Sequence, residues 1–189
     1  MHTDKTMSTS NLYRIIIHMG YSDVLQLVFN GVPAGVYSIL RDDRPVYVNK
    51  VLGAVVDGAW FAYIFLSQLL AVNRFVHIFT PHKVAYIFSD RSTKVFVAFC
   101  WIVGLCFVVA LCLPDVDFYY SVKISSYLYG SSPASLIVVS LNLYIDVAHS
   151  IGLIGWYFLI YVKVHLKDLL GRYLSLSMSQ KRMKNRQER

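Results

Sequence analysis

The stretch VFVAFCWIVGLCFVVALCL, residues 95–113, contains no charged side chain and nearly no polar one. The hydrocarbon core of a bilayer is roughly 30 Å thick, and a helix needs about 20 residues to cross it. A continuous apolar run of this length therefore predicts a membrane-spanning helix.

Three further apolar runs lie at residues 12–40, 51–79 and 135–164, each bounded by polar clusters. The runs are long and continuous and lack the alternation of barrel strands. The composition agrees, since 56% of the 189 residues are hydrophobic and 15% are charged. We therefore predict an all-α, multi-pass bundle with four visible transmembrane helices.

The basic residues predict how these helices are oriented. In a four-span arrangement, fourteen of the 18 lysines and arginines fall on the side of both termini, and four fall on the other side: Arg41, Arg44, Lys50 and Lys123. Because basic residues are enriched on the cytoplasmic side, we expect both termini to be cytoplasmic. Residues 165–189 then form a basic cytoplasmic tail suited to anionic lipid or to a cytosolic protein. Nucleic acid is not expected, because no aromatic residue interleaves with the charges of the tail's basic end.

Polar residues inside three of the spans recur at helical spacing, which places them on single faces. The residues in these stripes are Asp23, Gln26 and Asn30 in the first span, Asp57 and Gln68 in the second, and Asn142, Asp146, His149 and Ser150 in the fourth. Such stripes either bond to one another inside the bundle or line a hydrated cavity or ligand site, and the pattern leaves both open.

Motifs for catalysis or for metal binding are lacking in the sequence. The six histidines form no HExxH or comparable set, and no Gly-rich phosphate loop or GxSxG elbow occurs. The three cysteines all lie in the third span without CxxC spacing, so they predict no disulfide framework. We expect no enzyme activity, no cofactor and no metal.

The second span ends in LLAVNRFVHIFTPHK, residues 69–83, with Arg74 at its cytoplasmic end. Such an arginine, taken alone, reads as a side chain that snorkels to the headgroups. Three other segments accompany it in order: GYSDVLQLV before it, AFCWIVG after it, and the tyrosine-rich GWYFLIYVKV in the fourth span. This series resembles spans two to five of rhodopsin-like G-protein-coupled receptors. The amino-acid sequence of these segments is most similar to that of the nematode serpentine chemoreceptors of class T or class X.

The resemblance implies roles for particular residues. The coupling surface for a heterotrimeric G protein would comprise Asn73, Arg74, Phe75 and Pro81. The polar network in the bundle core would comprise Asp23 and Asn30, and the pocket for a small-molecule ligand would comprise Asp57, Trp60, Asn142 and Asp146. The resemblance also implies the plasma membrane as the location.

Three departures from the family pattern affect these implications. Asn73 replaces the acid that pairs with the motif's arginine, so a resting latch here would be a hydrogen bond. Asn49 stands near the place of a disulfide cysteine, so we expect no staple on the outer loop. Val56 occupies the place of the amine-binding aspartate, one residue before Asp57, so the resemblance does not imply an amine ligand.

The number of spans is the largest departure, because four are visible and the family has seven. We expect residues 1–189 to form one partial receptor domain that does not signal alone and that contacts a G protein only when completed to seven spans. The alternative is a self-contained four-helix membrane protein, such as a scaffold, channel or transporter subunit, whose polar stripes line a pore between copies.

Overall fold

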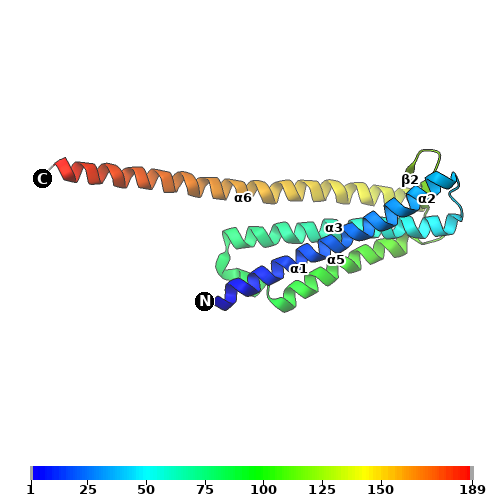
Figure 1. Ribbon diagram of the computed structural model, residues 1–189, viewed down its shortest axis with the longest axis horizontal. Coiled ribbons are helices and arrows are strands. Elements are labelled where there is room, and N and C mark those ends of the chain that lie inside the picture. Colours follow the sequence, from blue (N-terminus) through cyan, green and yellow to red (C-terminus); the bar gives the residue numbers. More distant parts are fainter. Residues whose placement is uncertain (1, 188–189) are drawn as a thin grey trace.

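The computed structural model describes the backbone of residues 2–187 and the side chains of residues 11–171. Long helices run alongside one another, and a short β hairpin closes the end at which α2, α3 and α6 lie close together (Figure 1). The elements in chain order are α1 (His2–Gln26), the π-helical turn η1 (Leu27–Gly31), α2 (Val32–Leu40), α3 (Val46–Phe79), the 3₁₀ turn η2 (Pro81–Lys83), α4 (Val84–Ile87), α5 (Asp90–Leu111), β1 (Phe118–Ser121), β2 (Ser126–Tyr129) and α6 (Pro133–Gln187).

Four helical stretches of the described chain are long and apolar enough to cross a membrane, which confirms the expected all-α, multi-pass fold. They are Asn11–Leu40, Val46–Phe79, Asp90–Cys112 and Pro133–Gly171. The fourth span belongs to α6, which has 55 residues and at 1.5 Å per residue is about 80 Å long. This helix is much longer than a bilayer is thick. Its last part projects past the other helices (Figure 1). The side chains of the predicted basic tail from residue 172 onward lie outside the described residues.

Helix α3 is the centre of the bundle. It packs against α1, α5, α6 and β1, and 44% of its most apolar segment is buried within the protein. The corresponding share for α6 is 6%. Helix α6 therefore contacts its neighbours along a narrow stripe. Its recorded contacts with α3 are mostly hydrogen bonds of polar side chains, and the Phe75–Trp156 ring pair adds an aromatic contact.

Glycines allow α3 and α5 to approach closely. A Cβ atom on Gly58 would lie 2.7 Å from the carbonyl oxygen of Gly104, and a Cβ on Gly104 would lie 2.5 Å from that of Gly58. Ala62 continues this stripe of small residues one turn further along α3. Backbone contact of this kind is the means by which membrane helices associate when the surrounding lipid is as apolar as the side chains.

The first span is interrupted by the π-helical turn η1, two residues before Pro33. Proline lacks an N–H, so the carbonyl of Phe29 has no donor at the usual fourth residue. The Tyr127 hydroxyl donates to that carbonyl at 3.5 Å. A π turn is also wider than an α turn, so residues on its two sides no longer share the face that regular helical spacing predicts.

The outer connection between α5 and α6 folds into an antiparallel hairpin in which Phe118 pairs with Tyr129 and Ser121 with Ser126. Its anchor is Asn49, which is 1% exposed. The Asn49 Oδ1 accepts from the backbone N–H of Tyr120 at 2.8 Å, and its Nδ2 donates to the Tyr120 carbonyl at 2.7 Å. All three cysteines are free. The outer loop therefore has no disulfide, as expected, yet one side-chain amide fixes it to the top of α3.

Candidate functional site

Polar side chains from α3 and α6 meet near the hairpin end of the bundle. The Asn142 Nδ2 donates to Asp57 Oδ2 at 3.2 Å and also to the Tyr129 hydroxyl. The Trp60 indole Nε1 donates to Asp146 Oδ1 at 3.1 Å. The four residues that the sequence suggested for a ligand pocket thus come together as two pairs across one helix interface.

Helical spacing explains this arrangement. Asp57 and Trp60 are three residues apart on α3, and Asn142 and Asp146 are four apart on α6, so each pair lies on one helix face. The depths of the pairs differ. Asp57 and Asn142 are each 9% exposed, whereas Trp60 is 38% exposed. The outer pair is therefore buried, and the next pair is reachable from outside the helix interface.

Sequence reasoning missed Tyr129, which β2 brings over the Asp57–Asn142 pair. Burial raises the pKa of the Tyr129 phenol, and the nearby Asp57 carboxylate raises it further. Burial likewise raises the pKa of Tyr127 to about 12. Both phenols are therefore uncharged donors at neutral pH. Alternating aromatic residues on either side of a short polar turn could have predicted the hairpin, but not which phenol turns toward α3.

Below these pairs the same interface continues with Gln68 of α3. Its Nε2 donates to the carbonyl oxygen of His149 at 2.7 Å and lies 2.9 Å from the imidazole Nδ1. A Cβ on Gly152, one turn further along α6, would lie 2.9 Å from the same Nε2. The glycine leaves room for the glutamine amide, so α6 is joined to α3 at a third level.

Arg74 lies at the opposite end of α3 and is exposed. Its guanidinium NH1 donates to the Tyr157 hydroxyl of α6 at 3.5 Å, and the Phe75 ring lies 5.0 Å from that of Trp156. Asn73 faces another way, because it is 1% exposed and its Oδ1 has no hydrogen-bond partner within residues 11–171. The hydrogen-bonded neighbour of Arg74 is therefore Tyr157, and Asn73 makes no recorded bond to it.

Pro81 opens the short turn η2 after α3 and is exposed, as Arg74 is. Of the four residues proposed for coupling, Arg74, Phe75 and Pro81 are thus at least partly accessible at this end. The fourth, Asn73, is packed inside the bundle.

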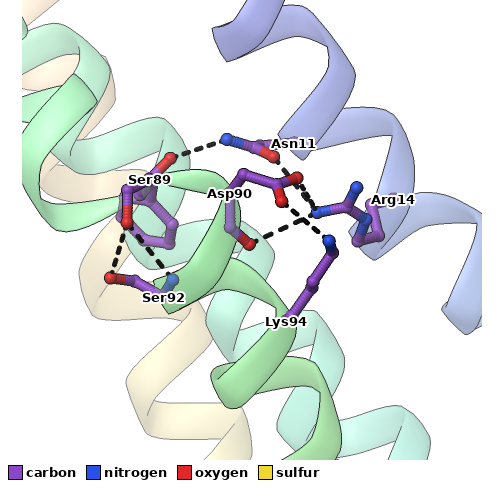
Figure 2. A network of polar contacts seen from close by, with 7 residues as sticks. Asn11, Arg14, Ser89, Asp90, Ser92 and Lys94 are labelled. Carbon is purple, nitrogen blue, oxygen red and sulfur yellow. Dashed lines mark hydrogen bonds and ion pairs between the residues drawn. The ribbon is translucent and has the colours of Figure 1, made fainter.

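A second polar cluster at this end joins α1 to α5 (Figure 2). Arg14 NH1 lies 2.7 Å from Asp90 Oδ1, and Lys94 Nζ lies 2.8 Å from Asp90 Oδ2. The Asn11 Nδ2 donates to the Phe88 carbonyl at 2.7 Å. Sequence reasoning missed the link between α1 and α5, because Arg14 and Asp90 lie 76 positions apart and helical spacing relates only near neighbours such as Asp90 and Lys94.

Asp23 and Asn30, suggested for a polar core network, are both exposed on the first span. Neither makes a recorded hydrogen bond within the described side chains, and Asn30 lies within η1 itself. Their neighbour Ser22 is the residue that faces inward, where its Oγ donates to the Ala59 carbonyl of α3 at 2.5 Å. The structure therefore does not bring Asp23 and Asn30 together with the α3–α6 residues.

Metal binding finds no support in residues 11–171, which contain no group of three or more His, Cys, Asp or Glu side chains placed to hold an ion.

These features define a multi-pass α-helical membrane protein with a polar site between two long helices and an exposed arginine at their other end. The family model for the serpentine type 7TM GPCR chemoreceptor Srx matches residues 16–188, so the chain belongs to that family. Comparison with curated proteins gives no match. The protein is thus a chemosensory, GPCR-like membrane receptor by family, and the family is one of receptors rather than of enzymes.

Proposed function

We propose that this receptor binds a small molecule between α3 and α6 beside the hairpin, and that it signals through Arg74 to a heterotrimeric G protein. The observation that carries the proposal is that α3 and α6 together hold both sites. Their outer halves bring Asp57 to Asn142 and Trp60 to Asp146, and their other ends bring Arg74 to Tyr157.

Coupling between the sites follows from the weak apolar packing of α6. With little buried surface, α6 is positioned by the polar contacts to α3, and a ligand that changes the outer contacts shifts the balance between arrangements of the two helices. Such a shift alters the distance between Arg74 and Tyr157. A freed guanidinium, with Phe75 and Pro81 at the same end of the bundle, is available to donate hydrogen bonds to carbonyl oxygens of a G protein helix.

The proposed orientation places Arg74 in the cytoplasm of a cell whose plasma membrane holds the receptor. The support is the distribution of basic residues, fourteen on the side of Arg74 and four on the side of the hairpin. Both termini are then cytoplasmic.

We further propose that the four described spans do not signal by themselves. Asp23 and Asn30 face outward from the first span, where an uncovered carboxylate or amide in hydrocarbon is costly. Further helices of a seven-span assembly would cover this face and complete a polar network around both residues. The 189-residue chain expressed alone should therefore give no G-protein activation above background.

The test of coupling uses a chimaera in which a member of the same family supplies the remaining spans. Arg74→Ala should abolish ligand-dependent nucleotide exchange by the G protein while leaving the amount of receptor in the membrane unchanged. Arg91→Ala is the matched control, because Arg91 is an exposed arginine on the same side and should leave exchange intact. Full exchange with the Arg74 variant would disprove its role.

A further inference from the structure

We infer that the site between α3 and α6 takes a small organic cation, whose ammonium group lies between Asp57 and Asp146. This inference rests on the proposed ligand site and names the chemistry of its ligand. It goes beyond the family resemblance, which implies no amine because Val56 stands at the place of the amine-binding aspartate.

The first argument is that the site holds two carboxylates, those of Asp57 and Asp146, with no cation recorded beside them within residues 11–171. Asp57 and Asp146 come from facing helices, and the groups recorded as donating to them are all neutral: Asn142 Nδ2 and the Tyr129 hydroxyl to Asp57, and Trp60 Nε1 to Asp146. The ion pairs recorded among the described side chains use other carboxylates, those of Asp90 and Asp117. The nearest imidazole on α6, that of His149, is engaged with Gln68. Two carboxylates at membrane depth without a cation are costly, and a positively charged ligand removes that cost.

The second argument is that the site contains a buried hydrogen-bond acceptor without a donor, the Oδ1 atom of Asn142. Asn142 is 9% exposed, and its Oδ1 has no hydrogen-bond partner among the described residues. The same amide donates to Asp57 from its nitrogen, so the free oxygen lies beside the carboxylate. A buried acceptor without a donor loses its hydrogen bonds to water and gains none in return, which destabilises the protein until a donor binds there. Asp57, Asp146 and Asn142 Oδ1 thus offer three acceptors, and a primary ammonium carries three N–H donors.

Aromatic rings decide between an organic cation and a metal ion. Trp60 and Tyr129 flank the acceptors, and the Trp60 ring stacks on Tyr63 with centroids 6.1 Å apart. The face of an indole or phenol attracts an ammonium group and also packs against the carbon skeleton attached to it. A small metal ion gains little from these rings and needs more oxygen ligands than the site supplies. Trp60 is 38% exposed, so a ligand can enter beside it.

The test measures binding to the full chain in lipid nanodiscs by equilibrium dialysis. The probes are 2-phenylethylamine and 2-phenylethanol, which share a ring and a chain length and differ in the charged group. The amine should bind at least about tenfold more tightly than the alcohol, since loss of one buried ion pair costs that much or more. Asp146→Asn and Asp57→Asn should each weaken amine binding by about tenfold or more and leave alcohol binding unchanged.

Asp115→Asn is the matched control, because Asp115 is an exposed carboxylate of the outer loop and should leave amine binding intact. Asp146 is only half-buried and its asparagine can still accept from Trp60, so this variant keeps the test valid if Asp57→Asn fails to fold.

Three results would overturn the inference: no binding of the amine, equal binding of amine and alcohol, or amine binding that both aspartate variants retain. Sodium chloride in place of the amine should not raise the unfolding temperature of the wild-type protein. A rise that Asp146→Asn removes would indicate a metal-ion site instead. Arg74-dependent G-protein activation is a separate readout. If amine binding fails while that activation persists, the ligand class is wrong and the proposed function stands.

Discussion

At the scale of single residues, Asn49 has the most consequential position in the outer half of the molecule. One amide satisfies both backbone groups of Tyr120, and its Nδ2 also lies 3.3 Å from the carbonyl of Asp43. Ser38 of α2 reaches the Tyr120 hydroxyl at 2.8 Å. The hairpin that carries Tyr129 over Asp57 is therefore held by hydrogen bonds that reducing agents do not affect.

Asn49→Ala should release the hairpin. The change leaves the buried N–H and carbonyl of Tyr120 without partners, which costs about 1–3 kcal/mol. Hydrogen exchange of the amides of residues 118–129 should therefore accelerate in the variant. Asn11→Ala is the control, because Asn11 is also buried but donates to the Phe88 carbonyl at the other end of the bundle, so exchange in the hairpin should not change. Unchanged exchange in the Asn49 variant would contradict the anchoring role.

At the scale of elements, the contact of α3 with α5 depends on backbone approach rather than on large side chains. Gly58 and Gly104 leave no room for a Cβ atom on either helix. The aromatic pair Phe61 and Phe107, with ring centroids 3.6 Å apart, lies next to this contact. Any added atom at the glycines must push apart two helices that are also fixed by this ring pair.

Gly104→Ala should therefore destabilise the bundle, although alanine favours a helix more than glycine does. The new Cβ would meet the Gly58 carbonyl oxygen at 2.5 Å and the Ala62 Cβ at 3.0 Å, and overpacking of this kind costs about 1–3 kcal/mol. Gly155→Ala on α6 is the matched control, because nothing lies within 4 Å of its added Cβ. The unfolding temperature measured in detergent should fall for Gly104→Ala and should not fall for Gly155→Ala. Equal unfolding temperatures would show that the helices can separate without cost.

At the scale of the whole molecule, the basic residues and the up-and-down path of the helices agree. Arg14, Arg74 and Lys94 lie at one end, and Lys50 and Lys123 lie at the hairpin end, where Lys50 pairs with Asp117 at 3.7 Å. A bundle whose ends differ this much in charge has one preferred direction of insertion.

Lys123→Asn tests that direction, because it creates an Asn-Ile-Ser acceptor for N-glycosylation in an exposed turn of the outer loop. The native sequence contains no such acceptor. The variant should gain one glycan when it is expressed in membranes that carry out glycosylation, since the loop is expected outside. Ser177→Asn creates a similar acceptor in the basic tail and should stay unmodified. The reverse pattern would place the termini outside and overturn the orientation.

How much could be predicted from sequence differs between fold and site. The four spans and the face shared by Asn142 and Asp146 follow from hydropathy and helical spacing, since both are local properties. The polar network expected around Asp23 and Asn30 stays a prediction, because both side chains are exposed on the first span and Asn30 lies within the π turn, where regular helical spacing ends. A local pattern predicts a face only while the helix remains regular.

The sequence by itself determined that this chain is a multi-pass helical membrane protein of receptor type, because apolar run length, charge asymmetry and motif order are all written along the chain. Only the tertiary structure decided that Asn49 holds the outer hairpin, that Tyr129 joins Asp57 and Asn142, and that Tyr157 rather than Asn73 bonds Arg74. Each of these contacts joins residues from different helices or from a hairpin. Spacing within one helix fixes the face of a side chain, whereas helix packing and the glycine contact fix which side chain of another element it meets.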